Sequence, residues 1–339
     1  MKKRDTKILI VCDSPYFTPR GYDFSQEFEH VDWYAESQAY ETLRELGYQV
    51  SIVGLYDNIS VLLDEVRENR PDVIFNLCEV FHQRSDLDKN VAAFFEILNI
   101  PYTGASPASL FICNDKALSK KILRFHRIRV PRFSAFYREH RVWLPKRLRL
   151  PLIVKPLTEE GSRGIALASV VDSEEAFLER VRFIHESLKN DAIAEEYIDG
   201  REFYVSVLGG KRLKVLPFRE CKFGQLPEDE PRIATYKAKW DGEYRKRWGI
   251  KNEFAGRISE EVEDRIKDIC KRAFRALRME SYARFDIRVT GAGRVYIIEA
   301  NANPSLEMGD EVVISAEKAG ITYERLLEKL IAFAFERNA

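Results

Sequence analysis

The chain has 339 residues, of which 45% are apolar and 32% are charged, and its 54 basic and 54 acidic side chains leave no formal net charge. This composition excludes a disordered chain and disfavours a nucleic-acid-binding protein, which usually carries a basic excess. No apolar run reaches the roughly 20 residues of a membrane helix. The five scattered cysteines lack a C-x-x-C pair, so we expect a cytoplasmic protein without disulfide scaffold or zinc site.

The first third of the chain alternates short apolar runs with helical patterns. Strands are predicted at 7–11, 49–55 and 71–77, and helices at 31–48, 59–69 and 89–100. Strands separated by helices of this length indicate βαβ units and a parallel sheet, whose ligands bind beyond the carboxyl ends of the strands. The segment "NLCEVFHQR" follows one such end, and within it Glu79 and His82 are either substrate contacts or ordinary loop residues.

The middle of the chain indicates a smaller α+β unit. It begins with a helix capped by Asn114 and continues through the strand "LPLIVKPL", the turn-rich "TEEGSRG", a further strand "IALASVV" and a helix at 173–189. Weak periodicity at 219–253 predicts a long loop, which in a compact domain is often functional. A helix at 259–279, an apolar hairpin and a helix at 322–337 complete the chain.

The hairpin "ARFDIRVTGAGRVYIIEANANPS" carries polar residues near its ends. If its turn is the four residues "TGAG", then Asp286, Glu299 and Asn301 share one face and Arg284 lies opposite Glu299. Facing carboxylates repel one another unless a cation or proton lies between them, and an all-oxygen set suits Mg²⁺. The alternative is an exposed polar hairpin end in which Arg284 simply pairs with Glu299.

A phosphate-binding element is predicted in "LPLIVKPLTEEGSRGIA". Lys155 ends an apolar strand, and Ser162 lies in a glycine-containing turn where backbone N–H groups can approach a phosphate. The segment is not a Walker A loop, and an ordinary hairpin turn is the alternative. Lys116 and Lys239 are further basic candidates, unless they are solvated side chains.

The segment "IAEEYIDGREFYV" has free backbone groups between two predicted strands, which could read a purine edge. Glu195 would accept from the exocyclic amine, beside Tyr197 and Ile198, and Glu202 would bind the ribose hydroxyls. A plain β-turn at Asp199–Gly200 is the alternative.

Taken in order, "NIPYTGASPASLFICNDKALSKKIL", "KPLTEEGSRGI", "AEEYIDGREFYV", "YKAKW", "ARFDIRV" and "IIEANANPS" resemble ATP-grasp carboxylate–amine ligases of the D-alanine–D-alanine ligase branch. The resemblance runs from about Asn76 to the end of the chain. It implies an α/β (α+β) ATP-grasp fold of three subdomains with an N-terminal parallel-sheet domain. The expected ranges are 1–113, 114–200 and 201–339, with ATP between the second and third.

The resemblance also implies cofactors, substrates and residue roles. The cofactors are ATP and Mg²⁺, with two ions expected and Mn²⁺ as an alternative, and the substrates are a small carboxylate and an amine. The implied nucleotide contacts are Lys116 and Lys155 at the α- and β-phosphates, Ser162 over the phosphates, Glu195, Tyr197 and Ile198 at adenine, and Glu202 at ribose. The implied metal ligands are Asp286, Glu299 and Asn301, and the implied catalytic groups are Lys239 at the γ-phosphate, Arg284 at the acyl intermediate and the N–H of Ser305.

Several positions depart from the family pattern. The Gly-Gly-x-Ser-x-Glu segment has no counterpart in "CDSPYFTPRGYDF", and "EVFHQRSDLD" replaces Gly-Glu-Asp-Gly. Trp240 replaces a tyrosine, Ser305 replaces the glycine of Pro-Gly, and Asp310 replaces a serine that binds a substrate carboxylate. Because an aspartate there would repel a carboxylate, the substrate pocket is expected to differ.

We therefore predict an ADP-forming ligase that makes an amide or peptide bond through an acyl phosphate, on an amino acid or small carboxylate other than D-alanine. The alternatives are a true D-alanine–D-alanine ligase with an unusual pocket, an ATP-grasp phosphotransferase, and a nucleotide-binding module without turnover. The resemblance also suggests a homodimer, although no residue here carries that suggestion.

Overall fold

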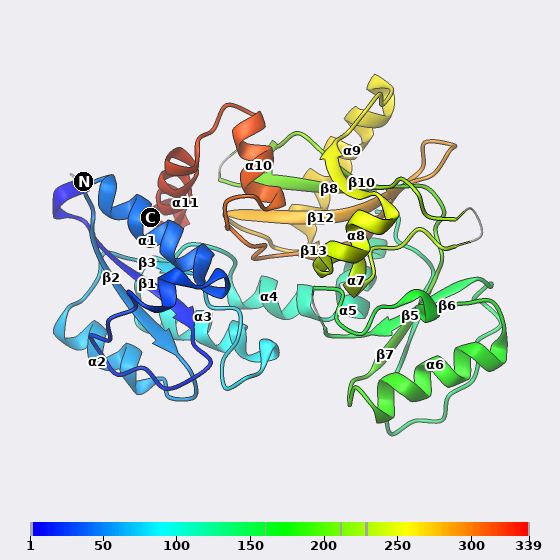
Figure 1. The fold of residues 1–339 in the computed structure, drawn as a ribbon, viewed down its shortest axis with the longest axis horizontal. Helices are drawn as coiled ribbons and strands as arrows, with labels where there is room; N and C mark the ends of the chain where they lie inside the picture. Colours follow the sequence, from blue (N-terminus) through cyan, green and yellow to red (C-terminus); the bar gives the residue numbers. More distant parts are fainter. Residues whose placement is uncertain (1–2, 160, 211, 228–229, 338–339) are drawn as a thin grey trace.

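The computed structural model describes residues 3–159, 161–210, 212–227 and 230–337. Glu160, inside the predicted phosphate-binding turn, and residues 228–229, inside the predicted long loop, lie outside these ranges. In the described residues the strands form three sheets joined by helices, and both ends of the chain lie beside the first sheet (Figure 1). None of the described helices is both long and apolar enough to span a membrane.

The first sheet is parallel, as the alternating pattern predicts, and has the strand order β2-β1-β3. Its strands are β1 (Lys7–Asp13), β2 (Gln49–Leu55) and β3 (Val73–Asn76). The helices of this part are α1 (Tyr34–Glu45), α2 (Ser60–Glu68) and α3 (Asp88–Ile97). Residues 8–12 of β1 are all buried, as expected for the central strand of a parallel sheet covered on both faces.

The last helix of the chain returns to this first sheet. Helix α11 (Tyr323–Arg337) follows α10 (Glu311–Lys318) and places Leu326 and Leu330 in one core cluster with Ile10 and Phe75. The stretch after the hairpin is also fixed here, because the Asn303 side chain accepts a hydrogen bond from the Ala105 N–H at 2.7 Å. These contacts hold the carboxyl ends of β1 and β3 toward the end of the hairpin.

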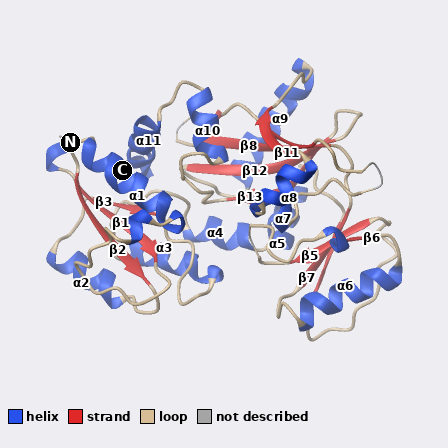
Figure 2. Cartoon of the chain, in the orientation of Figure 1, coloured by secondary structure: helices blue, strands red, loops and turns tan. Residues whose placement is uncertain are grey.

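The second sheet is antiparallel, with the order β4-β7-β5-β6, and α6 (Glu174–Glu186) packs on it (Figure 2). Its strands are β4 (Phe133–Phe136), β5 (Leu152–Pro156), β6 (Val170–Val171) and β7 (Ala192–Glu196). The predicted strand "IALASVV" is wrong except for the two residues of β6. The Ser169 hydroxyl accepts from the Ala166 N–H at 3.0 Å, and such local bonds compete with a strand ladder.

The third sheet is also antiparallel and has the order β11-β10-β8-β12-β13, with β9 paired to β8. Its strands are β8 (Arg201–Leu208), β9 (Lys214–Val215), β10 (Arg219–Phe223), β11 (Ile250–Phe254), β12 (Tyr282–Val289) and β13 (Val295–Asn301). Helix α9 (Glu260–Ala276) buries Ile266, Cys270 and Phe274. This sheet contains the predicted hairpin, formed by β12 and β13.

The region 219–253 was predicted to hold a long loop, and the described residues 224–227 and 230–235 between β10 and α7 form no helix or strand. The region contains β10, β11 and two short helices, α7 (Tyr236–Trp240) and α8 (Gly242–Trp248). Strand β11 lies at the edge of the sheet and exposes Lys251 and Glu253, and exposed charges of this kind are common at sheet edges and hide the apolar pattern.

Helices α4 (Pro107–Asn114) and α5 (Lys116–Phe125) connect the first sheet to the other two. The predicted cap is wrong by one residue: Asn114 ends α4, and Asp115 caps α5 by accepting from the N–H groups of Ala117 and Leu118 at 2.8 Å each. Lys116 is therefore the first residue of α5, and Lys120 lies one turn later on the same side of the helix.

Candidate active site

The β12–β13 hairpin has a different register from the predicted one but the same faces. Asp286 lies opposite Glu299 and Arg284 lies opposite Asn301, so the predicted pairing of Arg284 with Glu299 is wrong. Compared with the predicted pairing, the observed turn shifts the register by one residue, because Val289 pairs with Val295 rather than Arg294. A β-bulge after Asp286 shifts it by one more residue. Because side chains alternate with a period of two, these shifts together leave both carboxylates and Asn301 on one face, as predicted.

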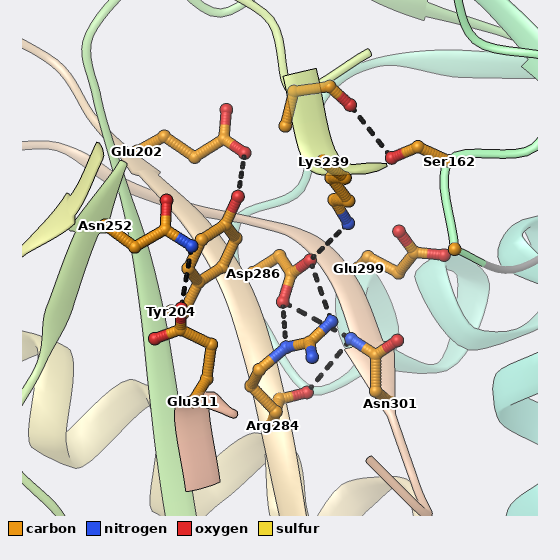
Figure 3. A network of polar contacts seen from close by, with 12 residues as sticks. Ser162, Glu202, Tyr204, Lys239, Asn252, Arg284, Asp286, Glu299, Asn301 and Glu311 are labelled. Carbon is orange, nitrogen blue, oxygen red and sulfur yellow. Dashed lines mark hydrogen bonds and ion pairs between the residues drawn. The ribbon is translucent and has the colours of Figure 1, made fainter. Parts of the chain in front are cut away.

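Fixed cations surround the two carboxylates of this face. Arg284 donates to Asp286 at 2.8 and 3.4 Å, and the Asn301 amide donates to Asp286 at 3.3 Å (Figure 3). The Lys239 ammonium reaches to 3.8 Å from Asp286. Asp286 is only 5% exposed, so the alternative of a solvated polar hairpin end is wrong.

Glu299 is held in its ionised form. Burial alone would raise the pKa of its carboxyl, but Lys116 at 3.0 Å, then Lys155 and Lys239, bring that pKa well below its usual range. Lys116 also donates to the backbone carbonyl of Glu159, at the start of the glycine-containing turn. One ammonium therefore links the hairpin to the predicted phosphate-binding element.

Lys120 belongs to the same site and was not predicted. Its ammonium lies 3.2 Å from Glu195, Lys155 lies 3.4 Å from the same oxygen, and all three side chains are buried. Burial lowers the pKa of Lys120 to about 8, although Glu195 opposes that change. Its i,i+4 spacing from Lys116 in "KALSK" is the sequence signal that could have found it.

Most of the predicted nucleotide and metal residues line one cavity between the second and third sheets, which we call the intersheet cavity. The predicted residues that line it are Lys155, Ser162, Glu195, Tyr197, Ile198, Glu202, Lys239, Asp286 and Glu299. Its volume is about 60 Å³. Ligand pockets usually measure roughly 300–1,000 Å³, so a nucleotide can enter only if the segments around the cavity move apart.

Two segments, 161–165 and 233–240, close this cavity, and we call them the covering segments. The Ser162 hydroxyl donates to the Ala234 carbonyl at 2.8 Å, and the Tyr236 N–H donates to the Ile165 carbonyl at 3.0 Å. The Trp240 ring N–H donates to the Gly161 carbonyl at 2.9 Å, although 64% of that side chain is exposed. These few bonds hold the two segments against each other.

Residues 197–200, which include the predicted adenine contacts Tyr197 and Ile198 and which we call the hinge, connect two sheets. Strand β7 ends at Glu196 in the second sheet and β8 begins at Arg201 in the third, so Asp199–Gly200 does not join two paired strands of a hairpin. Glu202 accepts from the buried guanidinium of Arg288 at 2.6 and 3.1 Å. The hinge therefore crosses the intersheet cavity, and Glu202 stands at its edge.

A second cavity of about 590 Å³ lies at the carboxyl ends of β1 and β3, as the parallel sheet predicts. We call it the acidic cavity after the carboxylates in its lining, which are Asp13, Asp32, Glu36, Asp86 and Glu159. Arg84 and Arg163 also line it, but Arg84 is paired with Asp86 at 2.7 Å. Through Glu159 this cavity adjoins Lys116 and Glu299.

None of the predicted substrate residues Glu79, His82, Trp240 and Asp310 lines the acidic cavity. Glu79 and His82 are absent from its lining, where their neighbours Val80 and Gln83 stand instead. Asp310 caps α10 without a side-chain hydrogen bond. The Ser305 hydroxyl accepts from the Glu307 N–H at 3.2 Å. Asp13 belongs to "CDSPYF", which follows a predicted strand at the ligand-binding edge, whereas sequence reasoning missed Glu36, which belongs to no recognised motif.

A larger groove of about 920 Å³ lies beside the hairpin turn and the start of α9. Of the predicted site residues only Glu202 reaches it, so its size does not make it the better candidate.

Within the described ranges no three His, Cys, Asp or Glu side chains form a metal-binding group. The hairpin offers two carboxylates and one amide, which fits Mg²⁺, since Mg²⁺ takes few protein oxygens and completes its shell with water and phosphate.

Comparison with known proteins identifies the family. Residues 122–332 match the family model for the D-ala D-ala ligase C-terminus. The uncharacterized protein y4sG of Sinorhizobium fredii is 31% identical over 78% of this chain and 75% of its own length. The D-alanine–D-alanine ligase of Aquifex aeolicus is 26% identical over 86% of this chain and 91% of its own length.

Solved structures show the same fold. The D-alanine–D-alanine ligase of Bacillus anthracis complexed with ATP superposes with a TM-score of 0.75 at 21% identity, over 98% of each chain. The VanG D-Ala:D-Ser ligase of Enterococcus faecalis gives a TM-score of 0.70 at 20% identity, over 97% of this chain and 99% of that one. The chain belongs to the ATP-grasp, D-alanine–D-alanine ligase-like family, whose members are ADP-forming ligases.

Proposed function

We propose that the chain is an ATP-dependent carboxylate–amine ligase that forms an amide through an acyl phosphate, on substrates other than D-alanine. The observation that carries this proposal is the convergence of Lys116, Lys239 and Arg284 on the facing pair Asp286 and Glu299, where two sheets meet. Fixed cations in a buried site stabilise a phosphoryl group during transfer, because they need no reorganisation.

ATP is proposed to occupy the intersheet cavity once the covering segments have moved apart. Glu195, Tyr197 and Ile198 would surround adenine, and Glu202 would bind ribose. The buried oxygens of Glu195 face two ammonium groups but accept no aligned hydrogen bond, so they can accept from an exocyclic amine. The proposed subdomains remain 1–113, 114–200 and 201–339.

The phosphates would lie along Lys155 and Lys116, under Ser162. Asp286, Glu299 and Asn301 would hold Mg²⁺, with two ions proposed and Mn²⁺ as an alternative. Their all-oxygen donor set and the ionised state of Glu299 fit this ion. When bound, Mg²⁺ neutralises charge on the transferred phosphoryl group.

The reaction then follows from the chain's own groups. A substrate carboxylate oxygen attacks the γ-phosphorus, the bond to ADP breaks, and Lys239 neutralises charge on the phosphoryl group. An amine nitrogen next attacks the acyl carbon, where Arg284 and the Ser305 N–H stabilise the oxyanion; inorganic phosphate leaves and the nitrogen loses a proton. The covering segments keep water from the acyl phosphate while it exists.

The charge of the acidic cavity supports a proposal about the substrate. Glu36 is a partly buried carboxylate whose pKa is raised to about 7 by burial and then by Asp13 and Glu307. A cationic group would relieve this repulsion, and Trp33 and Tyr56 also line the cavity. We therefore propose that a substrate places a non-reacting ammonium group in this cavity, in addition to the neutral amine that attacks the acyl carbon, whereas D-alanine has only one amine.

The test is phosphate release from Mg-ATP against pooled D- and L-amino acids and diamines, followed by mass spectrometry of every active pool. A product mass equal to two substrates minus water, from a pool of cationic amines, is the expected result. Activity with D-alanine alone would establish the true D-alanine–D-alanine ligase instead. ADP and a phosphorylated product without free phosphate would establish the phosphotransferase.

Two further expectations remain proposals. All five cysteines are free and buried, which fits a reducing compartment, and we propose the cytoplasm. A homodimer is proposed from the resemblance to other ligases, and size-exclusion chromatography with light scattering decides it.

A further inference from the structure

Arg288 uses all of its hydrogen-bond donors inside the protein. It lies on β12, two residues beyond Asp286 on the same face, and is 4% exposed. Its five N–H groups are matched by five contacts. The acceptors are Glu202 twice, at 2.6 and 3.1 Å, the carbonyls of Ile198 at 3.2 Å and Gly200 at 3.4 Å, and the carbonyl of Arg232.

These acceptors come from two separate segments, residues 198–202 and Arg232. Ile198 and Gly200 belong to the hinge between the second and third sheets, and Glu202 lies directly opposite Arg288 on the neighbouring strand β8. Arg232 immediately precedes the covering segment 233–240. A single guanidinium thus joins the hinge, Glu202 and the start of one covering segment.

The position of Arg288 also connects it to the reacting end of the cavity. Asp286 and Arg284 lie on the same strand and face, so the strand that holds Arg288 also holds the proposed metal ligand. Arg288 itself lines the intersheet cavity. Its guanidinium lies 5.6 Å from the centre of the Tyr197 ring in the hinge. A planar, always charged side chain can hold this set of acceptors, whereas an ammonium cannot span it.

From these contacts we propose that Arg288 is a positioning residue that couples nucleotide binding to closure of segment 233–240; this rests on the proposed function. A nucleotide that contacts the hinge and Glu202 fixes the acceptors of Arg288. The fixed guanidinium then holds the Arg232 carbonyl and keeps the covering segment in place. When Arg288 is lost, the segment opens while the acyl phosphate exists, and water replaces the amine as the attacking group.

The test compares Arg288→Lys and Arg288→Met with the control Arg201→Met. Arg201 forms a similar two-bond pair with Glu220, at 2.7 Å for each bond, on the same strand as Glu202 but outside the intersheet cavity. Arg288→Lys keeps the positive charge beside Glu202, so it remains informative if Arg288→Met fails to fold. Hydrogen exchange of residues 230–240 and 197–200, with and without Mg-ATP, is measured for each variant.

In the wild type, Mg-ATP should slow exchange in both segments together. In Arg288→Lys the hinge should still be protected by Mg-ATP, while protection of 230–240 is lost, and the KM for ATP should rise about tenfold. Phosphate released per amide formed should rise at least roughly twofold, because water reaches the acyl phosphate. Arg201→Met should match the wild type in each measurement.

Two results would overturn the proposal: nucleotide-dependent protection of 230–240 in Arg288→Lys equal to that of the wild type, or the same loss in Arg201→Met. The exchange experiment needs nucleotide binding but no turnover. If no amide forms with any substrate while the exchange result holds, the ligase assignment fails and the role of Arg288 stands.

Discussion

Replacing Glu36 by glutamine tests the electrostatics of the acidic cavity. The groups that interact with Glu36 come from three parts of the chain and are all acidic or neutral. They are Cys12 and Asp13 of β1, Glu307 after β13, and Tyr323 of α11. The Tyr323 hydroxyl is buried without a hydrogen-bond partner. No positive group among the described residues contributes to the pKa of Glu36.

The size of the effect follows from the pKa of that carboxyl, which rises from 4.5 to about 7 on folding. At about 1.36 kcal/mol per pKa unit this corresponds to roughly 3.4 kcal/mol, and solvent screening of a partly exposed side chain reduces it to about 1–2 kcal/mol. Between pH 4.5 and about 7 the folded chain binds the proton more tightly than the unfolded chain. Stability therefore falls as the pH rises through this window, and the full penalty is present above it.

Glu36→Gln should therefore raise the free energy of unfolding by about 1–2 kcal/mol at pH 8 and by less than about a third of that at pH 5. Urea unfolding at both pH values measures this. Glu41→Gln, at an exposed position of the same helix, is the control and should change neither value. Equal stabilisation by Glu36→Gln at both pH values, or none at pH 8, would refute the electrostatic reasoning.

Three further substitutions test the remaining assignments. Glu299→Ala should lower turnover more than about 100-fold and weaken ATP binding only partly, because Lys155 and the hinge remain. Phosphate release measures turnover and calorimetry measures ATP binding, and undiminished activity would contradict the metal assignment. Lys120→Met should lower the free energy of unfolding by roughly 1–3 kcal/mol. This is less than the loss expected for a fully broken buried ion pair, because Lys155 still faces Glu195. Thermal unfolding measures the change, and wild-type stability would show that Glu195 needs only one ammonium. Asp310→Ser should admit substrates with an α-carboxylate, and an unchanged amino-acid profile would remove Asp310 from the pocket.

The hairpin shows how far sequence reasoning reaches within one element. Alternation placed Asp286, Glu299 and Asn301 on one face, and the structure confirms this. The pairing of Arg284 could not be predicted, because a β-bulge changes which residues lie opposite each other without changing the face. Similarly, helical spacing located α5, but whether Asn114 or Asp115 caps it depends on where α4 ends.

Local periodicity and turn residues determined the parallel first sheet, the main helices and the polar face of the hairpin, because these features depend on neighbours within a few residues. The motifs also identified the family, because each motif is a short stretch of sequence that can be recognised without the tertiary structure. Only the tertiary structure decided that Lys120 meets Glu195, that Arg288 joins the hinge to the start of a covering segment, and that no cation among the described residues lowers the pKa of Glu36. Each of these depends on contacts between distant segments, and the charge of a side chain does not reveal which opposite charge, if any, folding will place beside it.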